Sequence, residues 1–402
     1  GNDIIEADNG SFDGSVRRIN NVTYYLGDGY NKLFASNGDE TIYAMGGQND
    51  IYSGEGIDVV YATDGTGNIS LGEGDDIVHI DGGDYKFYAG DGNDTFYVTA
   101  GTPYISGEKG NDVVFMEINS SMPLQLDEHK FKYGDVEITL ADSTEFLNIN
   151  DLSTETIIEN IVSDYSWGAA GLAVTSAGVI DLTNAEFILP EGHLSLSAEG
   201  IKGDIQSQVM ALTVVNTGTD DLADISVFEK DALEIAANYL ENGGLYTANG
   251  EINLELEQEN ALLTLRSGQI STAASGNDIH LVADDVDFRA GSGTISGTGN
   301  LTLQAKTDGS VYKIGAVESN TGNDFSDAGP DGAMDMSMRD LEAIADGFAL
   351  ITIGNDDPDT VMYIGDLKDR VFENFNKIKA DDDGIPIRPY SGNIVTYTEE
   401  TS

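Results

Sequence analysis

Residues 72–80 read GEGDDIVHI, and residues 90–98, eighteen positions later, read GDGNDTFYV. Both stretches begin with a Gly-x-Gly turn, continue through an Asp and end in alternating apolar residues. The same frame extends along the chain, because ten glycines stand nine residues apart: Gly29, Gly38, Gly47, Gly56, Gly65, Gly74, Gly83, Gly92, Gly101 and Gly110. A fixed period of this kind is the sequence signature of a repeat fold.

An apolar side chain follows four residues after each of these glycines. The set is Leu33, Ile42, Ile51, Val60, Ile69, Val78, Phe87, Phe96, Ile105 and Val114. Glycine permits turn conformations that a residue with a Cβ adopts only at a cost, and we expect each apolar residue to point inward between two short sheets. A single repeat cannot bury its own apolar residue, so stability is expected to come from the stacking of neighbouring repeats.

This nonapeptide pattern, G-G-x-G-x-D-x-U-x with U apolar, resembles that of the RTX (repeats-in-toxin) proteins over about residues 27–116. The resemblance implies an all-β fold, a right-handed parallel β-solenoid in which short strands and tight turns alternate to form a β-roll. Each full coil then takes two nonapeptides. The resemblance also implies a protein that is exported unfolded and folded by calcium outside the cell.

The position two residues after each repeat glycine alternates in chemistry. It is acidic in every second repeat, at Glu40, Asp58, Asp76, Asp94 and Asp112. Between them it is not acidic, at Asn31, Asn49, Gly67, Tyr85 and Pro103. Successive repeats lie on opposite edges of a roll, so we expect all of these carboxylates on one edge and none on the other.

The resemblance implies that calcium binds along the acidic edge, because the family's calcium-ligating Asp occupies this position. Calcium takes six to eight oxygen ligands, drawn from carboxylates and backbone carbonyls. The implied ligand set is Glu40, Gly54, Gly56, Asp58, Gly72, Gly74, Asp76, Gly90, Gly92, Asp94, Gly110 and Asp112. With one ion between consecutive loops, up to four ions are expected, and the extra methylene of Glu40 weakens the first. The alternative is a degenerate roll that keeps its shape and binds no metal.

The composition favours an extracellular protein, secreted or attached to a cell surface. The chain carries 71 acidic and 19 basic residues, a formal net charge of −52. Bound cations relieve the self-repulsion of such a surface, whereas nucleic acids and anionic membranes are repelled by it. Cys is absent, so disulfides and thiolate metal sites are excluded. No apolar stretch reaches the roughly 18 residues of a membrane span, so no membrane insertion is expected.

The pattern divides the chain into four segments. We expect residues 1–117 to form the roll, with an inserted loop at 6–26 that interrupts the nine-residue register, and residues 118–169 to form a connector or cap. Residues 170–320 are expected to form a parallel β-helix, and residues 321–402 a small α/β C-terminal capping segment with one helix. The chain begins within a nonapeptide, without Met or a signal peptide, so we expect it to be a piece of a longer protein.

Residues 170–320 show period-two alternation of apolar residues between Gly, Asn and Asp turns, which favours strands. The strand starts at Ile252, Ile279 and Leu301 are 27 and 22 residues apart, about one coil of a β-helix. Residues 293–303, GTISGTGNLTL, resemble the filamentous-haemagglutinin type of helix found in bacterial adhesins. A β-sandwich is the structural alternative for this region.

One helix is expected near the C-terminus, over residues 338–346. Ser337 can cap it, Asp340 stands where a capping box needs an acid, and Gly347 can end it. The following residues, 348–353, are expected to return to a strand.

The sequence predicts a calcium-stabilised structural or adhesive segment of a large secreted bacterial RTX protein. We predict that it is not an enzyme, because no catalytic motif is present and Arg266, His280 and Arg289 could share a face only in a favourable coil register. One alternative is a β-helix that binds or cleaves polysaccharide, as a lyase, epimerase or hydrolase. Another is a self-assembling surface-layer or filament subunit, since open solenoid ends can stack. Besides calcium, surface glycans and further copies of the chain are therefore the candidate partners.

Overall fold

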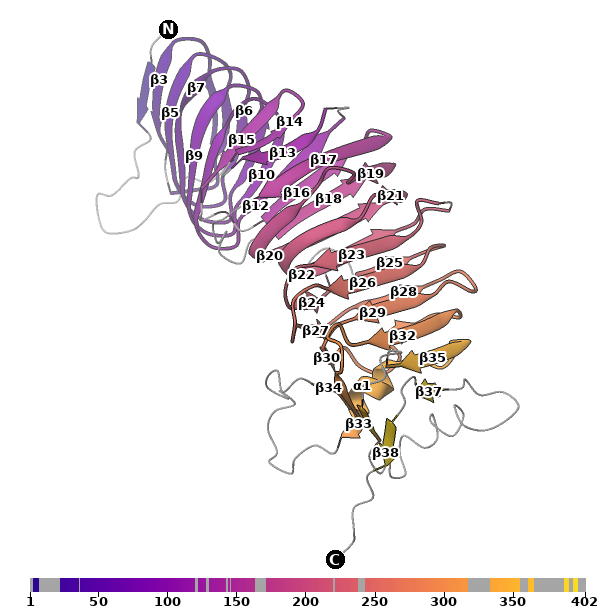
Figure 1. The fold of residues 1–402 in the computed structure, drawn as a ribbon. Helices are drawn as coiled ribbons and strands as arrows, with labels where there is room; N and C mark the ends of the chain where they lie inside the picture. The colour runs from indigo at the N-terminus through magenta and orange to yellow at the C-terminus, as the bar shows by residue number, and fades with distance from the viewer. Residues whose placement is uncertain are drawn as a thin grey trace, which may run out of the picture. The chain divides into compact units, whose positions relative to one another are not determined.

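The computed structural model describes residues 3–6, 22–35, 37–119, 122–127, 130–141, 144, 146–162, 171–219, 221–237, 243–316, 333–354, 361–364, 387–389 and 393–396. The fold is nearly all β, with 62% strand and 2% helix, and parallel stacked coils form a β-solenoid of about 12 turns (Figure 1). The predicted all-β parallel solenoid is therefore confirmed. The chain divides into two compact units, residues 1–178 with 188–194, and residues 179–187 with 195–402.

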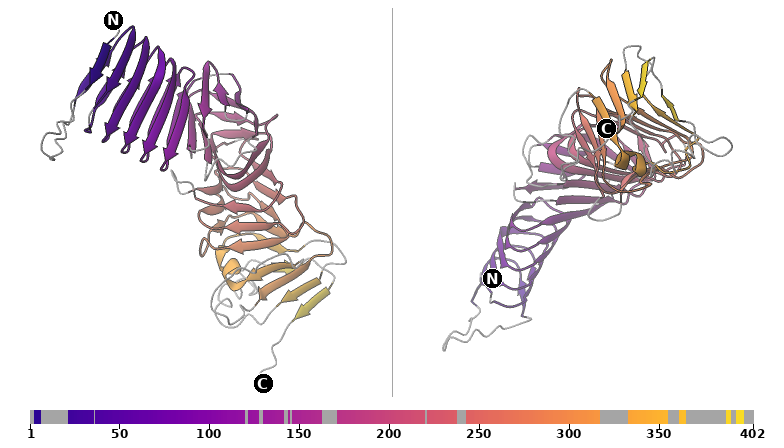
Figure 2. Two further views of the ribbon diagram at one scale, coloured as in Figure 1. Left: turned by 90° about the vertical axis from the view of Figure 1, so that its left-hand side faces the viewer. Right: turned by 90° about the horizontal axis from the view of Figure 1, so that it is seen from below.

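The roll in the first unit is built from two parallel ladders whose strands alternate along the chain (Figure 2). The first ladder contains β2 (Thr23–Leu26), β4 (Thr41–Ala44), β6 (Val59–Ala62), β8 (Ile77–Asp81), β10 (Thr95–Ala100) and β12 (Val113–Ile118). The second contains β1 (Asp3–Glu6), β3 (Tyr30–Phe34), β5 (Gln48–Glu55), β7 (Thr66–Glu73), β9 (Asp84–Asp91) and β11 (Tyr104–Lys109). Pairing partners such as Val60 and Val78 are one coil of two nonapeptides apart, as the period predicts.

The apolar residue of each nonapeptide lies between the two ladders. All ten residues of this set, from Leu33 to Val114, have an exposed fraction of 0%. Side chains alternate across a strand, so the residues between them face solvent. Burying one Val, Leu or Ile side chain contributes about 1.5–3 kcal/mol relative to leaving it exposed. Further buried apolar residues stand two positions along the strands, such as Ile80 after Val78 and Val98 after Phe96.

An insertion interrupts the roll near its first strand. Ile5 of β1 lies opposite Leu33 of β3, which is more than one regular coil away in the sequence. The insertion is shorter than the expected loop at 6–26, because Thr23–Leu26 already forms β2 in register with β4. The rest of the expected loop, residues 7–21, lies outside the described residues.

The segment expected as a connector or cap combines a hairpin with further coil strands. β13 (Leu124–Asp127), β14 (Lys130–Tyr133) and β15 (Val136–Leu140) pair in antiparallel order, and β15 also pairs in parallel with β11. β16 (Phe146–Asp151) extends the first ladder by pairing with β12, and β18 (Gly171–Ser176) pairs with β16. β17 (Glu155–Val162) pairs in parallel with β13.

The second unit is a β-helix with three strands in each regular coil. Its strands, in chain order, begin with β19 (Val179–Asp181), β20 (Phe187–Ala198, shared between the units), β21 (Gly200–Lys202) and β22 (Ile205–Asn216). One ladder contains β23 (Ile225–Glu229), β26 (Ile252–Leu256), β29 (Ile279–Val282), β32 (Asn300–Gln304), β35 (Leu350–Ile353) and β37 (Ile387–Pro389). The others contain β24 (Leu233–Ile235), β27 (Leu262–Leu265) and β30 (Asp285–Phe288), and β25 (Gly244–Thr247), β28 (Gln269–Thr272) and β31 (Ile295–Ser296).

The predicted coil spacing in this unit is correct. Ile279 lies opposite both Ile252 and Leu301, the two residues from which the coil lengths were estimated. The pairing is parallel throughout these ladders, so the alternative of a β-sandwich is excluded.

The second unit also contains a short helix and a small separate sheet. The helix α1 (Met338–Ala343) has Ser337 as its N-cap and a complete capping box with Asp340, as predicted. It ends before residue 346, because Ile344 is extended and forms a parallel bridge with Ile295. The sheet contains β33 (Val311–Ala316), β34 (Ala333–Ser337), β36 (Val361–Ile364) and β38 (Asn393–Thr396). Within the described residues, no helix has the length and apolarity needed to cross a bilayer.

Candidate metal sites

The acidic residues of the repeat lie where the chain turns from the second ladder of the roll to the first. We call Glu40 and the turns at residues 54–58, 72–76, 90–94 and 108–112 the acidic edge. In each turn the Asp directly precedes a first-ladder strand, so strand alternation directs it inward. Gly56 and Gly74 have φ values of +133° and +141°, a backbone conformation that L side chains rarely adopt.

All five acidic residues of the edge are buried, with exposed fractions of 0–1%: Glu40, Asp58, Asp76, Asp94 and Asp112. One carboxylate oxygen of the Asp residues is bonded to the preceding coil. The backbone N–H of Asp58 donates to Oδ1 of Asp76 at 2.7 Å, and that of Asp76 donates to Oδ1 of Asp94 at 2.8 Å. Equivalent bonds occur at both ends of the row: the backbone N–H of Glu40 donates to Oδ1 of Asp58, and that of Asp94 donates to Oδ1 of Asp112, each at 2.8 Å. The carboxylates therefore form a regular row along the roll.

The other carboxylate oxygen has no such bond in three successive coils. Oδ2 of Asp58, Asp76 and Asp94 is buried and has no hydrogen-bond partner. None of the ion pairs among the described residues involves these three side chains. A buried polar atom without a partner costs about 1–3 kcal/mol, and more if it is charged.

Burial raises the pKa of all three of these carboxyl groups. Burial, together with the neighbouring carboxylates of Asp58 and Asp94, raises the pKa of Asp76 to about 8. Burial raises the pKa of Asp94 to about 6, and it raises the pKa of Asp58 as well. A cation placed beside the row would favour the ionised form of all three.

Backbone carbonyls of the acidic edge point into the gaps between coils. A Cβ added to Gly74 would lie 1.8 Å from the carbonyl oxygen of Gly56, and one added to Gly92 would lie 1.9 Å from that of Gly74. A Cβ added to Gly72, Gly90 or Gly110 would likewise lie 1.6–2.0 Å from the carbonyl oxygen of Gly54, Gly72 or Gly92, respectively. These glycines are therefore required sterically, and their close approach leaves oxygen atoms between the coils.

The donor set fits calcium better than a transition metal. No three His, Cys, Asp or Glu side chains converge on one point among the described residues, so a site here must combine one or two carboxylates with carbonyl oxygens. Oxygen ligands of this mixed kind are those that calcium takes, whereas zinc takes Cys and His. Partnerless Oδ2 atoms and carbonyls directed between coils therefore fit the ligand set that the sequence predicts.

The opposite edge of the roll closes with protein hydrogen bonds. We call the inward row of Asn31, Asn49 and Tyr85 the amide edge. The side-chain amide of Asn31 donates to Oδ1 of Asn49 at 2.8 Å and to the carbonyl of Gly27 at 2.7 Å. Asn49 donates to the carbonyl of Gly46 at 2.8 Å and to the hydroxyl of Tyr85, two coils away, at 3.0 Å.

Glycines make room for the long side chain on the amide edge. Gly67 stands between Asn49 and Tyr85 in the row and has no side chain of its own, and a Cβ added to Gly83 would lie 2.9 Å from the ring of the buried Tyr85. The hydroxyl of Tyr85 would lie 2.6 Å from a Cβ added to Gly65, which shows how tightly it is held. No buried side-chain atom of this row lacks a partner among the described residues.

The basic residues considered for catalysis in the second unit do not form one group. Leu265 and Phe288 are register partners, so Arg266 and Arg289, which follow them, occupy the same position in neighbouring coils. His280 lies on another ladder, between Asn253 and Thr302. Arg266 pairs with Glu234 at 3.3 Å, and Arg289 pairs with Asp287 at 2.5 Å.

Sequence reasoning missed the buried acids of the second unit, of which Glu229 is the least exposed. Glu229 is 0% exposed, and burial raises its pKa to about 7. Both carboxylate oxygens accept hydrogen bonds, Oε2 from the hydroxyl of Ser207 at 2.6 Å and Oε1 from the backbone N–H of Val209 at 3.2 Å. The inward position of Glu229 could have been predicted from the sequence, because Ile225, Val227 and Glu229 alternate along one strand and therefore share its inner face.

In comparisons with known proteins, no family model, curated protein or solved structure matches the chain.

Proposed function

We propose that the roll binds calcium along its acidic edge, and that the chain is a calcium-stabilised structural or adhesive segment of a large secreted bacterial protein of RTX type. The observation that carries this proposal is the row of buried Oδ2 atoms of Asp58, Asp76 and Asp94, which have no hydrogen-bond partner. Three like charges in one buried row are unfavourable unless a cation joins them.

The ion would be held by these carboxylates together with glycine carbonyls from the turns at residues 54–56, 72–74 and 90–92. Bound there, calcium would supply the positive charge that the row lacks. The Asp residues already hold neighbouring coils together through their Oδ1 atoms. Because the turns come from successive coils, cation binding and closure of the roll are coupled.

The charge of the chain supports an environment rich in divalent cations. A formal net charge of −52 opposes compaction, and bound cations reduce that opposition. Extracellular calcium modules bind with dissociation constants of about 10⁻⁴–10⁻³ M, which suits a segment that folds only after export.

A structural or adhesive role is favoured over catalysis by the register of the second unit. The grouping of Arg266, His280 and Arg289, which the sequence left open, is divided between two ladders. The arginines that do lie in neighbouring coils are each paired with an acidic residue. We therefore expect no turnover in lyase, epimerase and hydrolase assays on acidic and neutral polysaccharides. Activity that is lost on Arg266→Ala or His280→Ala would favour the enzyme instead.

Calorimetric titration of the decalcified chain with calcium tests the binding proposal. The wild type should bind up to four ions. Asp76→Asn should weaken binding by about tenfold or more, because it removes a charged ligand from the middle of the row. Asp84→Asn is the matched control, since Asp84 is exposed on β9, and its titration should equal that of the wild type.

The same variant separates a metal site from a degenerate roll by the sign of its effect on stability. In excess chelator above pH 8, where the carboxyl of Asp76 is ionised, Asp76→Asn should stabilise the roll, because it removes a buried charge and keeps the Oδ1 atom that accepts from the backbone N–H of Asp58. In saturating calcium it should destabilise the roll. A variant with the same sign in both conditions, or a wild type that binds no calcium, contradicts the proposal.

A further inference from the structure

Six aromatic rings form one uninterrupted stack on the outer face of the first ladder. They are Tyr25, Tyr43, Tyr61, His79, Tyr97 and Phe115, one from each of six neighbouring strands. The centroids of successive rings lie 4.8–5.3 Å apart, and their planes differ by 4–15°. In-register parallel pairing sets this spacing, because neighbouring strands are about 4.8 Å apart.

A row of β-branched side chains runs beside the rings. Two residues before each ring stands Thr23, Thr41, Val59, Ile77, Thr95 or Val113. We call the aromatic row and this β-branched row together the ladder face. Every residue of the ladder face is at least partly exposed, and none is Asp, Glu, Lys or Arg. In a chain with a net charge of −52, it is a surface from which charge is absent.

Carboxylates border the ladder face on both sides. Asp39 and Asp75 lie two residues before the β-branched row, and Asp81 and Glu117 lie two residues after the aromatic row. All four are exposed, and the equivalent positions of the other coils hold no Lys or Arg. An apolar strip between negative borders favours a ligand that is itself apolar and carries positive charge.

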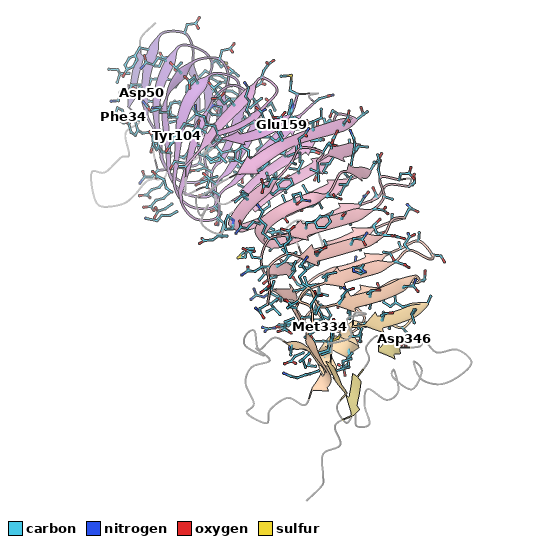
Figure 3. All side chains as sticks on the ribbon, viewed as in Figure 1. Phe34, Asp50, Tyr104, Glu159, Met334 and Asp346 are labelled. Carbon is cyan, nitrogen blue, oxygen red and sulfur yellow. The ribbon has the colours of Figure 1, made fainter. Side chains whose placement is uncertain are left out.

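The outer face of the second ladder lacks this combination. Lys32 and Asp50 stand in the central row of this face. Phe34 lies in the neighbouring row of the same face, and Phe34 and Asp50 are both labelled in Figure 3. Phe34 and Tyr52 stack at 5.0 Å, but Ser70 follows in the next coil and the stack ends. The ammonium group of Lys32 lies 4.8 Å from the centroid of Phe34. This face therefore serves as an internal comparison within the same roll.

The stacking of the rings restricts what can bind. Each inner ring has both of its faces covered by its neighbours, so sugar rings cannot stack on them as they do on isolated aromatic side chains. The exposed parts are ring edges, repeated at the strand spacing beside β-branched side chains. A complementary ligand must be long and flat, so that it can lie along the stack and touch several coils at once.

We propose that the ladder face is a binding site for planar, rod-shaped aromatic cations, which lie parallel to the stack against the ring edges and the β-branched row. Contact with several coils supplies the apolar area, and the borders of Asp39, Asp75, Asp81 and Glu117 supply the charge complementarity. The charge favours this occupant over a second copy of the chain, because face-to-face packing of two copies would bring four carboxylates of each together.

Thioflavin T, a flat benzothiazolium cation, is the probe for this site. With the full chain in saturating calcium, its fluorescence should rise and saturate. The double variant Tyr43→Ser/Tyr61→Ser, which removes neighbouring rings from the middle of the stack, should weaken binding by about tenfold or more. The control Tyr52→Ser/Tyr88→Ser removes two tyrosines from the other face and should leave the dissociation constant within about twofold.

Two substitutions of opposite charge at Val59 test the proposal even if the tyrosine variant does not fold. Val59→Lys and Val59→Glu both keep all six rings and remove the same partly exposed side chain. Val59→Lys should weaken thioflavin T binding, whereas Val59→Glu should retain or strengthen it. Equal effects of the two variants, equal losses from both tyrosine pairs, or no saturable signal would overturn the proposal. A signal that appears only with a dimer in sedimentation would instead assign the face to a second copy.

Discussion

The acidic edge and the amide edge of the roll share one nine-residue period but satisfy their inward polar groups differently. On the amide edge, Asn49 donates to Gly46 and to Tyr85, so protein groups complete the hydrogen bonding. On the acidic edge, the carboxylates of Asp76 and Asp94 accept hydrogen bonds only through Oδ1, and their Oδ2 atoms have no partner. One residue in each nonapeptide therefore determines whether an edge closes by itself or has a place for a cation.

Removal of calcium should produce a larger difference in stability between the two units than any substitution. A ligand that binds only the folded state adds RT ln(1 + [L]/Kd), about 2.7 kcal/mol for each site at a hundredfold excess over Kd. Several such sites are comparable with the whole stability of a domain, about 5–15 kcal/mol. In excess chelator, residues 27–116 should lose protection in hydrogen exchange, while most of residues 170–320 keep it. Full protection of the roll under these conditions would mean that the acidic edge needs no cation.

A smaller effect, of pH, should come from Glu229 in the second unit. This acid is buried like Asp76, but hydrogen bonds reach both of its oxygens, so calcium should not affect it. Burial raises its pKa from 4.5 to about 7, so the folded state binds more protons than the unfolded chain between these values. The contribution of Glu229 to stability is therefore greatest below about pH 4.5 and is lost as the pH rises to about 7.

The variant Glu229→Gln should remove the part of the slope that comes from Glu229 and stabilise the second unit by up to about 3 kcal/mol at pH 8. Chemical denaturation at pH 4 and pH 8, in chelator so that the second unit is followed alone, measures the difference. If the variant and the wild type lose stability equally between the two pH values, the slope belongs to another group.

The smallest expected effect concerns the amide edge. Tyr85→Phe removes the hydroxyl that accepts from the side chain of Asn49 and leaves that buried donor with one bond fewer. The roll should lose about 1–2 kcal/mol, and the number of calcium ions bound should not change. A lower calcium stoichiometry would show that the two edges do not act separately, which would break the comparison.

The regular parts of the fold were predictable because each nonapeptide repeats the same environment. A glycine followed four residues later by an apolar residue fixes both a turn and an inward side chain. The ten apolar residues of this set, one in each nonapeptide, are all buried as predicted. The row of carboxylates was predictable for the same reason. The eighteen-residue spacing of Tyr25, Tyr43 and Tyr61 was also readable, since in-register pairing turns it into a stack.

Contacts that skip a coil or interrupt the period were not predictable. Tyr85 closes the amide edge by reaching Asn49 two coils away, past a glycine, and no local pattern encodes that reach. The hairpin of β14 and β15 interrupts the parallel order within the segment expected as a connector or cap. Likewise, α1 ends early because Ile344 pairs with Ile295, a residue of a distant strand.

The most direct test of the calcium proposal is an anomalous difference map from a crystal grown with calcium. We predict peaks between coils along the acidic edge, beside Asp58, Asp76 and Asp94, and no peak along the amide edge beside Asn31, Asn49 and Tyr85. Peaks of equal height on both edges, or an acidic edge without any peak in saturating calcium, would contradict the account.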